Sequence, residues 1–352
     1  MIGPVNKNDV SSIGPILNKY NLKPSSFEQL GKVTKIVTDK GIYALKSITH
    51  KINPSFPTFL QHLFQQGYTR AVPIYPTVEG KYLVYHNQKF YYLMPWLKSN
   101  TPEHRGDHYH AFFKEIARIH LTTARKQQIN DEKDITDHYE TIIKTWEERN
   151  QFLEEFVEKA EAKWYMSPFE LQFCTYFYEI NLASSFARTQ LDKWHELMVE
   201  RKSFRTALTL NNLSDTHFLY GEDGKGYLSN FERAGFANPT NDLVSLYYRI
   251  LKTYPTLCTN CLEWFESYQS HFPLREEEFY LFLSHLTYPQ TLYRCVRNYT
   301  EHIQKKSERE HVQILQRAYW QTKNIEFVSV KLLEAERKRK EQEEEEEESH
   351  TE

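Results

Sequence analysis

The sequence predicts an α+β fold in which a small β-rich lobe is followed by a larger helical lobe. Residues 1–98 contain β-branched and aromatic runs separated by turn signals, a pattern typical of strands. From residue 108 onward, apolar residues recur at the three- and four-residue spacing of amphipathic helices. A chain of 352 residues can bury both lobes. We therefore expect a β-rich lobe with a hinge over residues 1–98, a helical lobe over 99–334 and an acidic, disordered tail over 335–352.

The β-rich lobe is predicted to run strand, strand, helix, strand, strand. The predicted strands are residues 32–39, 41–48, 81–86 and 89–96. Between the second and third strands, the segment SFPTFLQHLFQQ has apolar residues at helical spacing. This spacing predicts a helix over residues 55–67.

The helical lobe is predicted to begin after the break at Asn100-Thr101-Pro102. Its first helices are predicted over residues 108–124, 134–163 and 168–200. Ser167-Pro168 is typical of a helix start. A pair of short strands is predicted around Gly221–Gly224, and helices resume from about residue 240 to about residue 334. The charge run after Ala335 has no apolar face, which predicts a solvated or disordered tail.

The composition, 40% hydrophobic and 26% charged, is that of a globular protein, and a net charge of −3 argues against a nucleic-acid partner. No run of 18 apolar residues occurs, so we expect no membrane span. The N-terminus lacks the pattern of a secretory signal.

Cys258 and Cys261 have the spacing of a metal or redox pair, but no second pair follows them. We therefore expect this spacing to be a coincidence in a cytosolic, reduced chain.

Residues 208–243, LTLNNLSDTHFLYGEDGKGYLSNFERAGFANPTNDL, hold the most informative pattern of the chain. Their order resembles the active-site segment of kinase-like enzymes that phosphorylate sugars, choline or aminoglycosides. In those enzymes the segment runs His-x-Asp, then Asn, a hairpin and Asp-Phe. The first Asp orients the acceptor hydroxyl, while the Asn and the second Asp hold magnesium. The resemblance implies a protein-kinase-like, bilobal fold of the aminoglycoside phosphotransferase type.

The acidic residues of that segment are missing here. The His, first Asp, metal-binding Asn and second Asp positions are taken by Leu210, Asn212, His217 and Asn230. An amide cannot accept a proton as a carboxylate does, and magnesium prefers oxygen ligands to imidazole. We therefore expect neither efficient phosphoryl transfer nor a resident metal ion, and bound magnesium is doubtful. Asp215 and Glu232 are nearby acids that could rescue metal binding in a rearranged loop.

The resemblance also implies a nucleotide site in the β-rich lobe, with Lys46, Met94 and Trp96 as contacts if ATP still binds. The segment YALK ends a predicted strand in Lys46, whose amine could reach phosphate oxygens. Met94 and Trp96 would lie in the hinge that meets adenine. The plainer alternatives are an exposed strand lysine and a buried strand that ends at a proline.

The helix predicted after YALK has no acidic residue, whereas an active enzyme usually places a Glu there to pair with the lysine. Gln61 or Gln65 could hydrogen-bond to Lys46, but neither supplies a compensating charge.

The segment AGFANPTNDL resembles the G-x-P-x-x-D-L element that follows the second Asp in aminoglycoside and choline kinase-like proteins. There the Asp starts a helix and braces the catalytic loop. The resemblance implies a structural role for Pro239 and Asp242. A simple N-cap before LVSLYYRIL would give Asp242 nearly the same role.

Within this superfamily the chain resembles the spore-coat kinase-like proteins of the CotS family, most closely the group called YsxE, with YutH as a further relative. The segments YALK, ARIH, SNFERAGFANPTNDL and YPQTLYRCVRNY carry the resemblance over residues 5–330. It implies a protein made in the mother-cell cytoplasm and associated with the spore coat, with spore-coat proteins as partners.

The leading hypothesis is a pseudokinase that acts as a structural or interaction component in sporulation. One alternative is an atypical phosphotransferase that uses ATP on a small molecule, a coat polysaccharide or a coat protein. Another is a protein that binds a nucleotide without catalysis.

Overall fold

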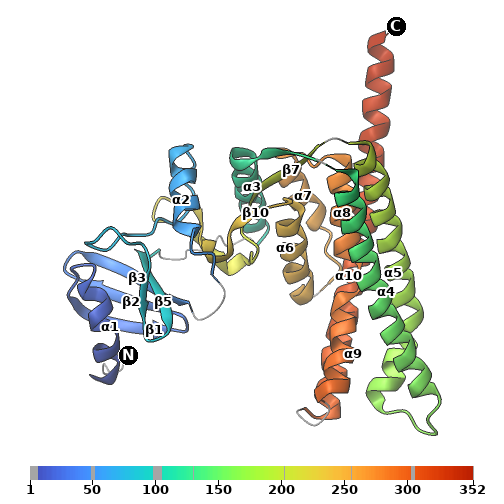
Figure 1. Cartoon of the computed structure of the whole chain (residues 1–352), viewed down its shortest axis with the longest axis horizontal. Helices are drawn as coiled ribbons and strands as arrows, with labels where there is room; N and C mark the ends of the chain where they lie inside the picture. The colour runs from blue at the N-terminus through green and yellow to red at the C-terminus, as the bar shows by residue number, and fades with distance from the viewer. Residues whose placement is uncertain are drawn as a thin grey trace. The chain divides into compact units, whose positions relative to one another are not determined.

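The computed structural model describes residues 7–48, 52–97, 105–129, 131–201, 203–254, 256–302 and 306–351. The chain divides into two compact units, coloured along the chain in Figure 1. The first comprises Met1–Thr123 and Leu208–Phe236, and the second comprises Ala124–Ala207 and Ala237–Glu352. The predicted lobe boundary between residues 98 and 99 falls outside the described residues.

The first unit contains a five-stranded antiparallel sheet in the order β1-β2-β3-β5-β4. Its strands are β1 (Pro24–Leu30), β2 (Val33–Thr38), β3 (Gly41–Ile48), β4 (Val84–His86) and β5 (Lys89–Pro95). Its helices are α1 (Lys7–Asn18), α2 (Phe56–Gln65) and α3 (Arg105–Thr123). The predicted order of strand, strand, helix, strand, strand is confirmed, with α1 and β1 added in front of it.

One face of the sheet packs against α1. In β2 every second side chain is buried, as a half-buried strand requires. Ile36, Leu45 and Leu93 pack on that face with Ile16 and Leu17 of α1. The opposite face of β3 carries Lys46, which lies directly across from Tyr92 of β5.

The second part of the first unit, Leu208–Phe236, forms short elements. These are η1 (Asp215–His217), β8 (Phe218–Tyr220), β9 (Gly226–Leu228), η2 (Phe231–Arg233) and β10 (Gly235–Ala237). β8 and β9 pair as the predicted hairpin, and its turn holds Gly224 at a φ of +69°, which glycine adopts without strain. Leu228 donates from its N–H to the Arg70 carbonyl at 2.7 Å and accepts from the Val72 N–H at 2.7 Å. These bonds join the hairpin to the segment between α2 and β4.

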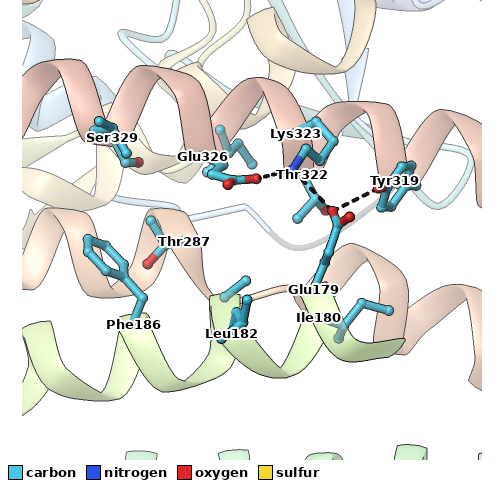
Figure 2. A pocket seen from close by; sticks show the side chains of 13 residues that line it. Glu179, Ile180, Leu182, Phe186, Thr287, Tyr319, Thr322, Lys323, Glu326 and Ser329 are labelled. Atoms are coloured by element: carbon cyan, nitrogen blue, oxygen red, sulfur yellow. Dashed lines mark hydrogen bonds and ion pairs between the residues drawn. The ribbon is translucent and has the colours of Figure 1, made fainter. Parts of the chain in front are cut away.

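The second unit is mainly helical. Its elements are β6 (Arg125–Gln128), α4 (Glu132–Glu161), α5 (Pro168–Glu200), β7 (Ser203–Thr209), α6 (Thr240–Thr253), α7 (Cys261–Gln269), α8 (Glu276–Thr287), α9 (Gln290–His302) and α10 (Glu308–Thr351). α5 has the predicted bounds, because Ser167 and Glu170 form a reciprocal capping box and Pro168 occupies the first turn. α5, α8 and α10 line an apolar pocket of about 380 Å³ (Figure 2).

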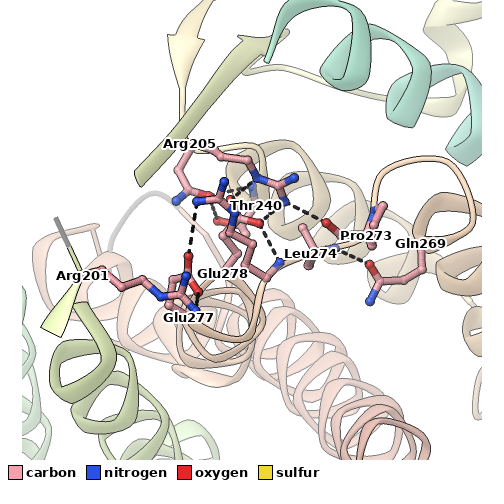
Figure 3. Close-up of polar contacts among 10 residues, drawn as sticks. Arg201, Arg205, Thr240, Gln269, Pro273, Leu274, Glu277 and Glu278 are labelled. Carbon is pink, nitrogen blue, oxygen red and sulfur yellow. Dashed lines mark hydrogen bonds and ion pairs between the residues drawn. The ribbon is translucent and has the colours of Figure 1, made fainter. Parts of the chain in front are cut away.

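A buried ionic cluster ties β7 to the start of α8 (Figure 3). The Arg205 guanidinium binds the Glu278 carboxylate with both ends, Nε to Oε1 at 2.9 Å and Nη2 to Oε2, and also donates to the Pro273 carbonyl at 2.8 Å. Next to it, Arg201 Nη2 lies 3.0 Å from Glu277 Oε2. Burial raises the pKa of Glu277, which the nearby arginines only partly oppose. The paired charges allow two adjacent acids to be buried.

The acidic tail differs from the prediction. α10 continues as a helix to Thr351, where a disordered segment over residues 335–352 was expected. The charges alternate in sign at helical spacing, so Arg337 pairs with Glu341 at 3.3 Å and Arg339 with Glu343 at 2.5 Å. Such pairs support a helix that has no apolar face.

The two cysteines of the C-x-x-C sequence form a disulfide, so the expectation of a chance spacing in a reduced chain is wrong at this pair. Cys258 lies just before α7 and Cys261 begins it, which brings their Cα atoms to 5.6 Å. Both are buried, and the Cys258 N–H donates to the Asn324 side chain of α10 at 2.9 Å. Sequence spacing alone did not reveal this local geometry.

Among the described residues, no helix combines the length and the apolar character that crossing a bilayer requires.

Candidate functional site

The centre of the candidate site is the side chain of Lys46. Its Nζ lies 2.5 Å from the Oδ1 atom of Asn230 and 2.5 Å from the Oε1 atom of Glu232. The Lys46 side chain is 14% exposed and the Glu232 side chain 7%. A cation and an anion held this close and this deep neutralise each other, so Lys46 is engaged by the protein itself.

Asn230 can face Lys46 because its backbone adopts the left-handed conformation, with φ 71° and ψ 48°. Asn and Asp visit this region more easily than other non-glycine residues. The turn places Asn230 before η2 and brings Glu232, two residues later, to the same amine. The structure therefore gathers Lys46, Asn230 and Glu232, which the sequence predicted as separate features.

Tyr92 completes this group; the sequence placed it in the predicted hinge segment but did not suggest that its side chain contacts Glu232. Its hydroxyl donates to Glu232 Oε1 at 2.9 Å, and the Lys46 Nζ lies 5.9 Å from the centre of its ring. Burial raises the pKa of Tyr92 well above its usual value, and the adjacent Glu232 charge raises it further, so the hydroxyl stays a donor. The register of β3 and β5, which the sequence did not specify, sets Tyr92 opposite Lys46.

Asn53 holds the backbone around Glu232 in place through two hydrogen bonds. The Asn53 N–H donates to the Glu232 carbonyl at 2.7 Å, and its side-chain amide donates to the Ala234 carbonyl at 2.9 Å. We expected that Gln61 could bond to Lys46, but the structure shows a different contact. Gln61 Nε2 donates to the Tyr82 hydroxyl at 2.7 Å. Glu232 thus supplies the charge that α2 lacks.

The side chains around Asn230 are closely packed. The cavity that they line, with Phe56, Tyr92, Met94 and Phe231 among its walls, measures about 10 Å³. This volume is at the lower limit for a single water molecule. The interior next to Asn230 is therefore filled by the protein's own side chains.

A larger hollow lies by the predicted hinge. It measures about 550 Å³ and is lined by Ile42, Trp96 and Leu97 together with residues 221–223 and Tyr227. Ile42 and Lys46 share one face of β3, since alternate strand residues point the same way. The Trp96 N–H donates to the Ile42 carbonyl at 3.2 Å, while Met94 is buried.

The loop before the hairpin carries the other expected positions. Leu210 is buried, and Asn212 and His217 are half-buried. The exposed Asp215 accepts from the Thr216 N–H at 2.8 Å and the Tyr109 hydroxyl at 3.4 Å. Asp215 thus stabilises the turn in which it lies. Glu232 is the acid that the structure brings to Lys46.

Pro239 and Asp242 lie at the start of α6. Pro239 occupies the N-cap position, and Asp242 is fully buried in the first turn. The capping bonds come from Asn238, whose Oδ1 accepts from the Thr240 N–H at 3.0 Å and its hydroxyl at 2.7 Å. A carboxylate in a first turn also interacts favourably with the helix dipole. The bracing role predicted for Asp242 stays a prediction.

The residues at the metal positions fit magnesium poorly. Asn212 and Asn230 offer neutral amide oxygens, His217 offers nitrogen, and Asn230 Oδ1 already accepts from Lys46. Glu232 is the carboxylate that the structure brings to Lys46, and its Oε1 already contacts the Lys46 amine and accepts from the Tyr92 hydroxyl. Its other oxygen, Oε2, is buried and has no hydrogen-bond partner among the described residues.

Comparison with solved structures identifies the fold. An aminoglycoside phosphotransferase from Alicyclobacillus acidocaldarius superposes with a TM-score of 0.73 at 16% identity, covering 95% of this chain and 97% of that one. The AMP-bound spectinomycin phosphotransferase gives a TM-score of 0.56 at 12% identity over 92% of this chain and 98% of that one. The amicoumacin kinase, solved with AMP-PNP, gives 0.53 at 14% identity over 92% and 94%. These similarities confirm the protein-kinase-like α+β fold.

Sequence comparison identifies the family resemblance. Residues 14–184 match the family model described as "Spore coat putative kinase YutH". A search of curated protein sequences finds no significant match. The predicted resemblance to spore-coat kinase-like proteins is therefore confirmed over residues 14–184.

Proposed function

We propose that this protein is a spore-coat-associated pseudokinase, a kinase-like scaffold that serves sporulation through structural or binding interactions. The observation that carries the proposal is the closed group of Lys46, Asn230 and Glu232. The amine that would reach phosphate is held 2.5 Å from an amide and a carboxylate of the same chain. A nucleotide phosphate would have to compete with that buried ion pair.

The catalytic positions support the same proposal. Asn212 replaces the residue that would orient the acceptor hydroxyl, and an amide has no useful basicity near neutral pH. Asn230 replaces a metal-binding carboxylate with a neutral oxygen. The fold is retained, whereas the charges that stabilise phosphoryl transfer are absent from these two positions.

The finer assignment to the YsxE group of the CotS family is part of this proposal. So are production in the mother-cell cytoplasm, assembly into or association with the coat, and spore-coat proteins as partners. A fluorescent fusion expressed in sporulating cells tests these points. It should accumulate in the mother cell and then surround the forespore, and a diffuse signal that never reaches the spore would contradict them.

The biochemical test is phosphate transfer from magnesium-ATP to coat extract by purified wild-type protein. We expect transfer no greater than that of a Lys46→Ala variant, since Lys46 does not serve catalysis. Turnover that the Lys46→Ala variant abolishes would overturn the pseudokinase proposal. A known aminoglycoside kinase assayed in parallel verifies that the conditions support transfer.

An atypical phosphotransferase is the second candidate, and one observation favours it. Glu232 Oε2 is a buried carboxylate oxygen without a hydrogen-bond partner among the described residues, and it belongs to the residue that shares Lys46 with the amide oxygen of Asn230. Oxygen donors of this kind suit magnesium better than an imidazole does. This candidate would act on a small molecule, a coat polysaccharide or a coat protein, with Glu232 or Asp215 rescuing the metal. It requires that Glu232→Gln remove the activity.

Nucleotide binding without catalysis is the third candidate, favoured by the hollow beside Trp96. Its volume of about 550 Å³ is within the range of small-molecule sites. Calorimetry with ATP, with and without magnesium, separates this candidate from the first. Metal-independent binding that Trp96→Ala weakens would support it, and the absence of binding heat would exclude it.

A further inference from the structure

The second unit contains a cavity of about 510 Å³, bordered by the start of α4, the end of α5, the start of β7 and the start of α8. All of its described lining residues belong to that unit. The volume is within the range of small-molecule sites. Lys46, Asn230 and Glu232 belong to the first unit, so what this cavity binds does not depend on the pseudokinase proposal.

Part of the cavity wall is apolar and aromatic. Trp194 and Met198 of α5 line it together with Phe204 of β7 and Leu281 of α8. The His138 ring of α4, also in the wall, lies 5.8 Å from the Trp194 ring. Partial burial lowers the pKa of His138, so this imidazole is uncharged near pH 7. An apolar ligand body would pack well against such a wall.

The wall becomes acidic at the start of α8. Glu277 and Glu278 both line the cavity, and each is 2% exposed. The exposed Asp134 of α4 adds a third carboxylate. Arg205 also lines the cavity, but its guanidinium is committed to Glu278 and to the Pro273 carbonyl (Figure 3). Three acids against one engaged arginine make the described lining favourable to a cation.

Glu277 has acceptor capacity that the protein leaves unused. Both of its carboxylate oxygens are buried, and neither accepts a hydrogen bond from another described residue. Arg201 Nη2 lies 3.0 Å from Oε2, and Arg275 Nη1 lies 4.0 Å from Oε1, so the charge is balanced only in part. Burial raises the pKa of Glu277, and its own backbone N–H and Arg201 oppose that rise incompletely. Buried oxygens in this state cost free energy until a donor reaches them.

These features select one class of ligand over the others. An anion would meet three carboxylates, and a purely apolar molecule would leave the Glu277 oxygens unsatisfied. A metal ion lacks a set of ligands, because no group of three His, Cys, Asp or Glu side chains suited to a metal occurs in the described part of the chain. An ammonium group supplies both the positive charge and the N–H donors that Glu277 lacks.

We propose that this cavity is a binding site for a small organic cation, whose ammonium group lies at Glu277 and whose apolar body packs against Trp194. The ammonium N–H groups donate to the Glu277 oxygens, which completes their hydrogen bonding. Met198, Phe204 and Leu281 enclose the rest of the ligand. Arg205 stays with Glu278 and keeps that second acid neutralised.

The first test is isothermal titration calorimetry of the full chain with three probes that share one apolar body and differ in charge. They are phenethylamine, phenethyl alcohol and hydrocinnamate. We expect the amine to bind about tenfold more tightly than the alcohol, because it adds a charge-assisted hydrogen bond, and we expect no binding of hydrocinnamate. Equal affinity for amine and alcohol would overturn the proposal. So would the absence of saturable amine binding at millimolar concentrations.

The second test locates the amine with variants. Glu277→Gln keeps the size of the side chain but removes its charge, so amine affinity should fall to that of the alcohol. Glu276→Gln is the matched control, because Glu276 pairs with Lys340 and is not among the lining residues. It should bind the amine as wild type does.

Ile135→Trp gives an independent test of the cavity itself. Ile135 is half-buried in the first turns of α4 and lines the cavity, so an indole there should fill it and abolish binding of amine and alcohol alike. Circular dichroism and the urea midpoint verify that each variant is folded, and Ile135→Trp carries the test if Glu277→Gln does not fold. Amine binding at the wild-type level in either folded variant would place the cation elsewhere and overturn the proposal.

Discussion

At the residue scale, the substitutions in the candidate site form a consistent electrostatic set. Lys46 is partly buried, and α2 offers it no acid. A lysine in that position is stable only with a nearby negative charge, and Glu232 supplies it at 2.5 Å. The Asn at position 230 adds a neutral acceptor, whereas an Asp there would place a second carboxylate beside Glu232. The site balances one cation against one anion.

Replacing Glu232 by Gln should therefore destabilise the protein. Gln keeps the size of the side chain and an oxygen for the Tyr92 hydroxyl, but it leaves Lys46 without a counter-charge. Removing one partner of a buried pair costs about 3–5 kcal/mol, and the partial exposure of Lys46 reduces our expectation to about 2 kcal/mol. Urea unfolding monitored by circular dichroism measures the difference.

Glu79→Gln is the control for this prediction, because the Glu79–Lys81 pair at 2.9 Å is well exposed. Its loss should change the free energy of unfolding by less than about 0.5 kcal/mol. A Lys46→Met, Glu232→Gln double variant should recover part of the stability lost by Glu232→Gln alone. Equal destabilisation by the two single carboxylate variants would refute the electrostatic explanation.

At the scale of secondary-structure elements, local signals in the sequence predicted most of the fold. Ser167-Pro168 indicated the start of α5, and β-branched and aromatic runs bounded by turn signals identified β2 and β3, because caps and turns act over a few residues. β1 was missed because it pairs with β2 through residues such as Ser26 and Glu28 that carry little strand signal. A strand that is stabilised mainly by pairing with a neighbouring strand shows only a weak strand pattern in its own sequence.

The candidate site was harder to predict for the same reason. Lys46 and Asn230 are 184 positions apart, and their contact depends on the left-handed turn at Asn230. The sequence identified both residues and named Glu232 as a nearby acid. It could not show that Glu232 pairs with Lys46, because no local spacing encodes that contact.

The start of α5 makes a prediction about pH. Burial alone would raise the pKa of Glu170, but the hydrogen bond from Lys163 and the Ser167 N–H lower it below its usual range. A carboxyl whose pKa is lowered on folding adds stability above its unfolded pKa of about 4.3, and that contribution is lost as the pH falls through the folded pKa. Glu170→Gln should therefore cost about 1 kcal/mol at neutral pH and progressively less as the pH falls from about 5 toward the folded pKa.

Urea unfolding of wild type and Glu170→Gln across the acidic range tests this expectation. Glu158→Gln serves as the control, since Glu158 is an exposed residue of α4. Its difference from wild type should stay near zero at every pH. A Glu170→Gln difference that persists unchanged at low pH would show that size or packing, rather than charge, is responsible.

At the scale of the whole molecule, α10 combines a structural part and a solvated part in one helix. Up to Leu332 it buries apolar side chains such as Leu315, Val328 and Leu332, and Asn324 contacts the loop of Cys258. Beyond Lys340, which pairs with Glu276, residues 341–345 are exposed. The stability of the second unit should therefore depend on the first part alone.

Deleting residues 341–352 should change the free energy of unfolding by less than about 0.5 kcal/mol, because the exposed residues 341–345 make only solvent-screened contacts along the helix. The far-ultraviolet helix signal should fall with the loss of the segment. Deletion from residue 328 onward should instead destabilise the protein by several kcal/mol, since it removes the buried Val328 and Leu332. Urea unfolding of both truncations alongside the full chain measures the contrast. A large loss of stability from the shorter truncation would mean that the acidic end packs against the rest of the protein.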